Sequence, residues 1–165
     1  MIQLDLSRPA LVVFDVWVWG LLSVGSGYFF HRRPVRSFDH DSWLTRLRPF
    51  ERDGRVYERR LRILKWKDRL PEAGALFAGG FSKRTALSRS TGYLERFVVE
   101  TRRAEVTHWA LLVAGPFFFL WNPWYAGVLM LVYAALANVP FIIIQRYNRA
   151  RLQRILAGRA ARQPA

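Results

Sequence analysis

The chain alternates long apolar runs with segments rich in arginine. Residues 10–30 and 124–144 are almost wholly apolar, and residues 109–121 form a shorter apolar run. About twenty apolar residues in a helix are enough to cross a hydrocarbon core of about 30 Å. The pattern therefore predicts an all-α integral membrane protein with about three transmembrane helices.

The order of these runs predicts how the chain is organised. Asn122-Pro123 is a turn signal between the second and third runs, so these runs should form a helical hairpin. Pro116 is expected to kink the helix before the turn. We expect one membrane domain over residues 1–165, made of a first span (10–30), a cytoplasmic and interfacial segment (31–91), an amphipathic helix running into the second span (92–121), a third span (124–145) and a basic cytoplasmic tail (146–165).

The segment between the first two spans carries aromatic residues among charges. Trp43, Leu44, Leu47 and Phe50 recur at helical spacing, which predicts helices lying on the membrane face. Apolar and basic residues partly alternate over residues 61–66, which leaves a strand as an alternative there.

Charge sets the expected orientation. The chain has a formal charge of +14 with 52% hydrophobic residues, and 19 of its 26 Lys and Arg lie within residues 31–103. Basic residues collect on the cytoplasmic side of membrane proteins. We therefore expect a multi-pass membrane protein with its N-terminus outside and its C-terminus cytoplasmic, rather than a nucleic-acid-binding protein. The chain has no cysteine, which excludes an acyl-cysteine intermediate.

Ionisable side chains directly precede the second span, at Glu100, Arg102, Arg103, Glu105 and His108. Such residues at a membrane boundary are costly and indicate function. Residues equidistant from the Asn122-Pro123 turn lie at the same depth in an antiparallel hairpin. At about 1.5 Å per residue, His108 lies roughly 21 Å from the turn, still within the hydrocarbon core. Counting in this way places Asn138 opposite His108, and Gln145 level with Glu100.

Three interpretations of His108 remain open. It is a packing histidine bonded to Asn138 or to a backbone carbonyl, or a metal ligand, because Glu105-x-x-His108 matches half of a di-metal motif. The spans contain no second histidine, so we expect no metal. In the third interpretation His108 is a general base for a hydroxyl group, Glu105 orients its imidazole, and Asn138 or an arginine stabilises the oxyanion.

The surrounding polar residues are candidates for substrate binding. Guanidinium groups suit the phosphates of an anionic donor such as acyl-CoA. The alternative is an internal ion pair between Glu100 and Arg146 or Arg149. Asp15, inside the first span, either pairs within the bundle or stays protonated. The candidate substrate-binding residues are Glu100, Arg102, Arg103, Gln145, Arg146, Asn148 and Arg149.

Three motifs in order resemble the glycosyl-4,4'-diaponeurosporenoate acyltransferases: residues 100–109, Lys65-Trp66-Lys67, and Asn138-Val139-Pro140 followed by residues 145–149. The resemblance implies a membrane O-acyltransferase of the bacterial cell membrane. It would esterify a sugar hydroxyl of a glycosylated carotenoid acid with a fatty acyl group in staphyloxanthin-like carotenoid biosynthesis. Its partners would be the lipid bilayer, a carotenoid glycoside acceptor and an activated acyl donor such as acyl-CoA, with no further cofactor. The alternative is a non-catalytic membrane protein that binds carotenoid or anionic lipid or holds biosynthetic enzymes together.

Overall fold

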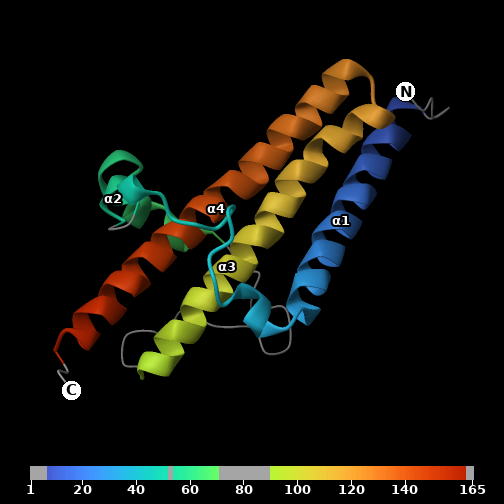
Figure 1. The fold of residues 1–165 in the computed structure, drawn as a ribbon. Helices are drawn as coiled ribbons and strands as arrows, with labels where there is room; N and C mark the ends of the chain where they lie inside the picture. The colour runs from blue at the N-terminus through green and yellow to red at the C-terminus, as the bar shows by residue number, and fades with distance from the viewer. Residues whose placement is uncertain (1–6, 52–53, 71–89, 163–165) are drawn as a thin grey trace. The chain divides into compact units, whose positions relative to one another are not determined.

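The computed structural model describes residues 7–51, 54–70 and 90–162, and within these residues it contains helices and no strand. Figure 1 shows the long helices running side by side within the ribbon and labels each α-helix. The predicted all-α class is confirmed for the described residues, whereas residues 71–89 of the predicted interfacial segment lie outside them. The α-helices are α1 (Arg8–Arg32), α2 (Arg55–Arg60), α3 (Thr91–Ala114) and α4 (Trp124–Ala160), and the 3-10 helices are η1 (Val35–Phe38), η2 (Pro49–Glu51), η3 (Ile63–Lys65), η4 (Lys67–Arg69) and η7 (Gly115–Leu120).

Two helices, α1 and α4, are long and apolar enough to cross a membrane. The predicted second span takes a different form. The sequence predicted one kinked helix over residues 92–121, but the α-helix ends at Ala114 and a 3-10 helix follows over Gly115–Leu120. Pro116 explains the difference, because it has no amide hydrogen to donate to the carbonyl four residues earlier and its ring crowds that carbonyl.

The chain forms two compact units. The first unit contains the residues up to Arg32 together with Thr107–Phe141, and the second contains Arg33–Val106 and the residues from Ile142 onward.

In the first unit, α1 packs along residues 107–121 and the start of α4 (Figure 1). A polar contact fixes the depth at which these helices meet: Asp15 accepts hydrogen bonds of 2.9 Å from the indole of Trp121 and from the amide of Asn122. The N-terminal part of α1 therefore lies at the hairpin turn. Below this contact the core contains Trp19, Leu111, Phe118 and Ala134.

Close helix contact in the hairpin depends on glycine. A Cβ added to Gly115 would lie 2.9 Å from the Cβ of Ala134, which is shorter than real Cβ contacts. Hydrogen at this position lets the two helices of the hairpin approach each other.

In the second unit, the first half of α3 packs on the C-terminal half of α4 through Leu94, Phe97, Val98 and Leu152. A second cluster joins the short helices to α4 and contains Tyr57, Ile63, Ile144 and Tyr147. The basic residues after Ile144, predicted as a tail, continue the helix to Ala160.

The helix predicted from Trp43 to Phe50 is wrong. The backbone turns at residues 43–45 instead, and the hydroxyl of Ser42 accepts a bond from the amide of Thr45. Serine and threonine side chains bond nearby backbone in this way and so compete with a helix. Trp43 and Phe50 are exposed, at 78% and 67%, while Leu47 is buried. The strand alternative over residues 61–66 is also wrong, because Ile63–Lys65 forms a 3-10 helix.

Candidate functional site

His108 meets Asn138 within the first unit. Nδ1 of His108 lies 3.0 Å from Oδ1 of Asn138, so the pairing predicted by counting from the turn is confirmed. Asn138 is 2% exposed. A buried amide of this kind is held in place by its hydrogen bonds.

The tautomer of His108 follows from the partners of Asn138. Nδ2 of Asn138 donates to the backbone carbonyl of Ala134 over 2.9 Å. A carbonyl can only accept, so this bond fixes which end of the amide faces the histidine. Oδ1 then accepts from Nδ1–H of the neutral imidazole, and Nε2 carries the lone pair. A histidine in this state can take a proton at Nε2.

Phe141 holds the plane of the imidazole. Its ring stacks on His108 with centroids 4.8 Å apart and an interplanar angle of 10°. The hydrogen bond and the stacked ring together restrict both the position and the rotation of the imidazole. Phe141 covers one face of the ring, and the lone pair of Nε2 lies in the ring plane.

The second candidate for a polar role in the first unit is Asp15. It is 6% exposed and pairs with Trp121 and Asn122, which answers the question that the sequence left open. Its partners lie at the hairpin turn, so the carboxylate joins α1 to the turn.

Glu105, in the second unit, has two arginine partners. Its Oε1 accepts from Nη1 of Arg146 and its Oε2 from Nη2 of Arg149, each over 2.6 Å. Both Glu105 and Arg149 are fully buried. A buried carboxylate between two guanidinium groups is compensated in charge, and removing one partner from such a group is costly. One of the two alternatives from sequence was an ion pair of Arg146 or Arg149 with Glu100; the carboxylate that pairs with both arginines is Glu105.

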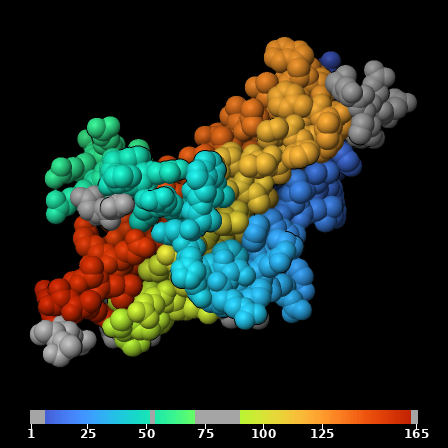
Figure 2. Space-filling model, in the orientation of Figure 1, coloured from blue at the N-terminus to red at the C-terminus, as the bar shows by residue number. Residues whose placement is uncertain are grey.

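Arg146 joins α4 to the segment of residues 34–51, hereafter the strap. Its Nε and Nη2 bind the two carboxylate oxygens of Glu51, each over 2.7 Å, in the bidentate arrangement that suits a guanidinium. It also donates to the carbonyls of Leu44 and Arg46. Figure 2 shows the strap in cyan over α4 in red.

Burial alone would raise the pKa of Glu51, but hydrogen bonds outweigh it. Arg146, the hydroxyl of Tyr57 and the backbone amide of Arg48 all donate to the carboxylate, and they lower its pKa to about 2. The same contact raises the pKa of the Tyr57 hydroxyl, together with burial. Glu51 is therefore ionised at every physiological pH.

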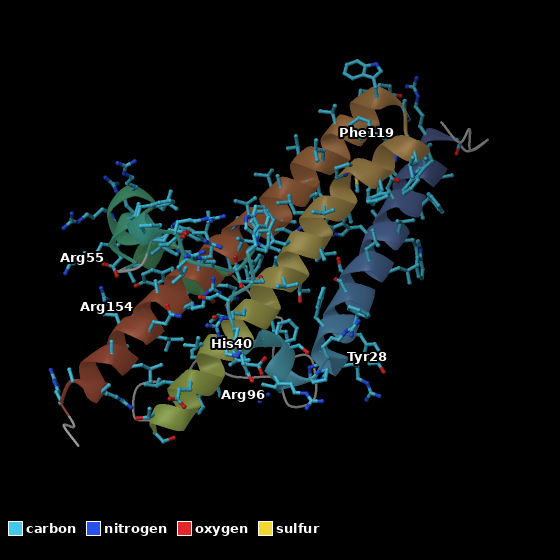
Figure 3. All side chains as sticks on the ribbon, in the orientation of Figure 1. Tyr28, His40, Arg55, Arg96, Phe119 and Arg154 are labelled. Atoms are coloured by element: carbon cyan, nitrogen blue, oxygen red, sulfur yellow. The ribbon has the colours of Figure 1, made fainter. Side chains whose placement is uncertain are left out.

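The remaining charged candidates also have partners inside the second unit. Arg102 donates to Asp41 over 2.6 Å and to the carbonyls of Phe38 and Asp39, on the strap. Glu100 accepts from Arg96 and Arg103 on its own helix. Figure 3 labels Arg96 on α3 and His40 on the strap.

The structure thus joins some predicted site residues and not others. It brings together His108 with Asn138, and Glu105 with Arg146 and Arg149. Gln145 and Asn148 are half-buried on α4. Sequence reasoning missed Glu51, Tyr57 and Phe141. Phe141 stands three residues after Asn138, which is the spacing of one helix face and a signal that was readable.

Comparison with known proteins points to one family. A family model described as glycosyl-4,4'-diaponeurosporenoate acyltransferase matches residues 40–158. A Staphylococcus aureus protein of that name is 33% identical over 107 residues, which are 65% of this chain and 64% of that protein. The protein of the same name from a bovine strain is 28% identical over 138 residues, 84% of this chain and 83% of its own. No solved structure matches the chain.

Proposed function

Because the chain belongs to the glycosyl-4,4'-diaponeurosporenoate acyltransferase family, we propose that it transfers a fatty acyl group to a sugar hydroxyl of a glycosylated carotenoid acid. The chain spans 64% of the length of the Staphylococcus aureus relative, and the name of that relative supplies the substrate class. The observation that carries the proposal is the bond chain from the carbonyl of Ala134 through Asn138 to His108. It leaves Nε2 of His108 as a proton acceptor.

A single general base is enough for the proposed acyl transfer. Nε2 of His108 takes the proton of the sugar hydroxyl as the hydroxyl oxygen attacks the carbonyl carbon of an activated acyl donor such as acyl-CoA. The carbon–sulfur bond of the thioester then breaks, and the proton on the imidazole passes to the leaving thiolate. General base catalysis of this kind contributes a rate factor of about 10²–10⁴.

Asn138 acts as a positioning residue in this scheme. From the sequence, Asn138 was a candidate for stabilising the oxyanion. In the structure its Oδ1 faces His108 and its Nδ2 donates to the carbonyl of Ala134. Its contacts support the holding of the imidazole. The role of orienting His108, predicted for Glu105, passes to Asn138 and Phe141, since the two carboxylate oxygens of Glu105 receive Arg146 and Arg149.

The arginines hold the second unit together in this proposal. Arg102 and Arg146 bind the strap through carboxylates and carbonyls. Binding of the donor's phosphates by Arg102, Arg103, Arg146 and Arg149 stays a prediction from sequence, and so does substrate binding by Glu100, Gln145 and Asn148.

We further propose that the protein is a multi-pass membrane protein with a cytoplasmic C-terminus. Two apolar helices support this, and so does the position of the basic residues. At this orientation the glycoside reaches His108 from the lipid side, and the donor arrives from the cytoplasm.

The test is a histidine exchange in cells that also make a glycosylated carotenoid acid. We expect His108→Ala to lower the fatty ester, measured by mass spectrometry per amount of membrane-bound protein, by a factor of about 10²–10⁴. The matched control is His40→Ala, because His40 is exposed on the strap. Undiminished ester in His108→Ala would remove the histidine mechanism. No ester from the unaltered protein would favour a binding protein instead of an enzyme.

A further inference from the structure

A groove runs between α1 and α3 in the first unit. Its volume is about 490 Å³, and it is lined by apolar and small side chains that include Val18, Leu22, Gly25 and Ser26 of α1 and Ala110 and Ala114 of α3. The hydroxyl of Ser26 is satisfied by the carbonyl of Ser23 over 3.2 Å. The groove therefore suits an apolar occupant.

The depth of the groove relative to His108 follows from the contacts of α1. Asp15 meets Trp121, and Trp19 meets Phe118 with ring centroids 5.9 Å apart. The two segments are therefore antiparallel, and each residue forward along α1 lies level with a residue one position earlier on the 107–121 segment. Counted in this way, Ser26 lies level with Ala110. His108 lies two residues beyond Ala110, about 3 Å along the helix. In Figure 3, the label Tyr28 marks the C-terminal part of α1, and the label Phe119 marks the region near the hairpin turn.

The groove begins at the level of Ser26 and Ala110, about 3 Å along the helix from His108, and runs toward the hairpin turn. From Ser26 to Val18 it extends about 12 Å along α1. An apolar chain that extends from His108 toward the turn reaches the level of the groove within its first few carbons.

We propose that this groove holds the acyl chain of the donor and selects its length; the inference rests on the acyl transfer proposed above. The position at which the groove begins indicates which of the two substrates has an apolar part that can occupy it. In the donor, the chain begins at the reacting carbonyl carbon itself. In the acceptor, the sugar ring separates the reacting hydroxyl from the apolar part. Only the donor's chain begins within the first few ångströms below His108.

Gly25 provides a way to fill the groove. A Cβ added at Gly25 meets no atom within 4 Å, so a longer side chain enters the groove without a clash at its root. Gly20 has the same free space but does not line the groove, which makes it the matched control.

The experiment measures the acyl chains of the ester in cells supplied with octanoic and palmitic acids together. Each methylene group removed from apolar contact weakens binding about fourfold. We expect Gly25→Leu to lower the ratio of palmitoyl to octanoyl ester at least about tenfold, and Gly25→Ala to lower it less. Gly20→Leu should leave the ratio unchanged. An unchanged ratio in Gly25→Leu overturns the proposal, as does an altered use of the glycoside at a constant ratio.

A second readout separates this inference from the proposed function. A palmitic acid analogue with a photoreactive diazirine is added to membranes, and labelled peptides are located by mass spectrometry. We expect labelling of residues 18–26 that falls in Gly25→Leu and persists in Gly20→Leu. Labelling without any ester would refute the enzyme while the chain-binding groove stands. Ester formation with neither labelling nor a shift in chain length would refute the groove and leave the enzyme.

Discussion

The orientation of one amide group determines what His108 can do. Asn138 has an oxygen that accepts and a nitrogen that donates, and the carbonyl of Ala134 settles which faces the imidazole. The hydrogen bond therefore selects one tautomer and one ring rotation together. A static base of this kind needs no rearrangement before it accepts a proton.

Replacing Asn138 tests this at the level of a single bond. In Asn138→Leu the imidazole loses its acceptor, so Nδ1–H is left buried and both tautomers become available. We expect ester formation per membrane-bound protein to fall about tenfold, a loss equal to about 1.4 kcal/mol. Asn138→Asp keeps an oxygen toward His108 and should retain more activity than Asn138→Leu. Equal ester in the wild type and in Asn138→Leu would show that the orientation of the imidazole does not matter.

Glu51 makes the stability of the second unit sensitive to acid. Its pKa is lowered to about 2 in the folded protein, against an ordinary value of 4.5. A carboxyl group with a lowered pKa stabilises the fold at every pH above its unfolded pKa, and this stabilisation is lost as the pH falls through the folded value. We expect stability to decrease between about pH 4.5 and about pH 2, with the loss measured by thermal unfolding in detergent.

The control for this prediction is Glu51→Gln, which cannot ionise. It should be less stable than the wild type at pH 6, because the Arg146 guanidinium loses a charged partner. It should also lose less stability on acidification. If the wild type and Glu51→Gln lost the same stability on acidification, the loss would come from other carboxylates.

At the scale of elements, a proline and a glycine have different roles at the end of α3. Pro116 ends α3 at Ala114, and Gly115 lets the chain pass close to α4. The 3-10 helix that follows still buries Phe118 completely. The change of helix type therefore keeps the apolar face of the chain toward α4.

Gly115→Ala should destabilise the first unit. The added methyl group lies 2.9 Å from the Cβ of Ala134, and neither atom sits at the end of a flexible side chain. Overpacking of this kind costs about 1–3 kcal/mol. Gly20→Ala is the control, since its methyl group has open space and removes a helical glycine. Thermal unfolding in detergent should give a lower midpoint for Gly115→Ala only, and equal midpoints would mean that the helices separate easily.

At the scale of the whole molecule, sequence patterns predict contacts that follow from depth and miss those that bridge distant segments. Counting from the Asn122-Pro123 turn paired His108 with Asn138, because depth in a hairpin depends only on helix rise. The same counting placed Gln145 level with Glu100 and left an ion pair of Glu100 with Arg146 or Arg149 as an alternative, since counting gives level and not rotation about the helix axis. The strap contacts of Arg146 with Glu51 join positions 95 residues apart. No local periodicity encodes them.

The absence of cysteine allows a direct test of membrane topology. The native chain contains none, so a single introduced thiol is the only one present. Trp124 is 74% exposed at the hairpin turn, and a side chain at Gly158 meets no atom within 4 Å. We expect a membrane-impermeant maleimide to label Trp124→Cys in intact cells and Gly158→Cys only after lysis. The reverse result would invert the proposed topology.

The bond between Asp15 and the hairpin turn has a consequence for assembly in the bilayer. An apolar helix can slide along an apolar neighbour at little cost, because lipid tails replace the contacts it loses. A shift of α1 by one turn would leave the carboxylate, the Trp121 indole and the Asn122 amide facing hydrocarbon without partners. The hydrogen bonds of Asp15 therefore set a single register of α1 against the hairpin.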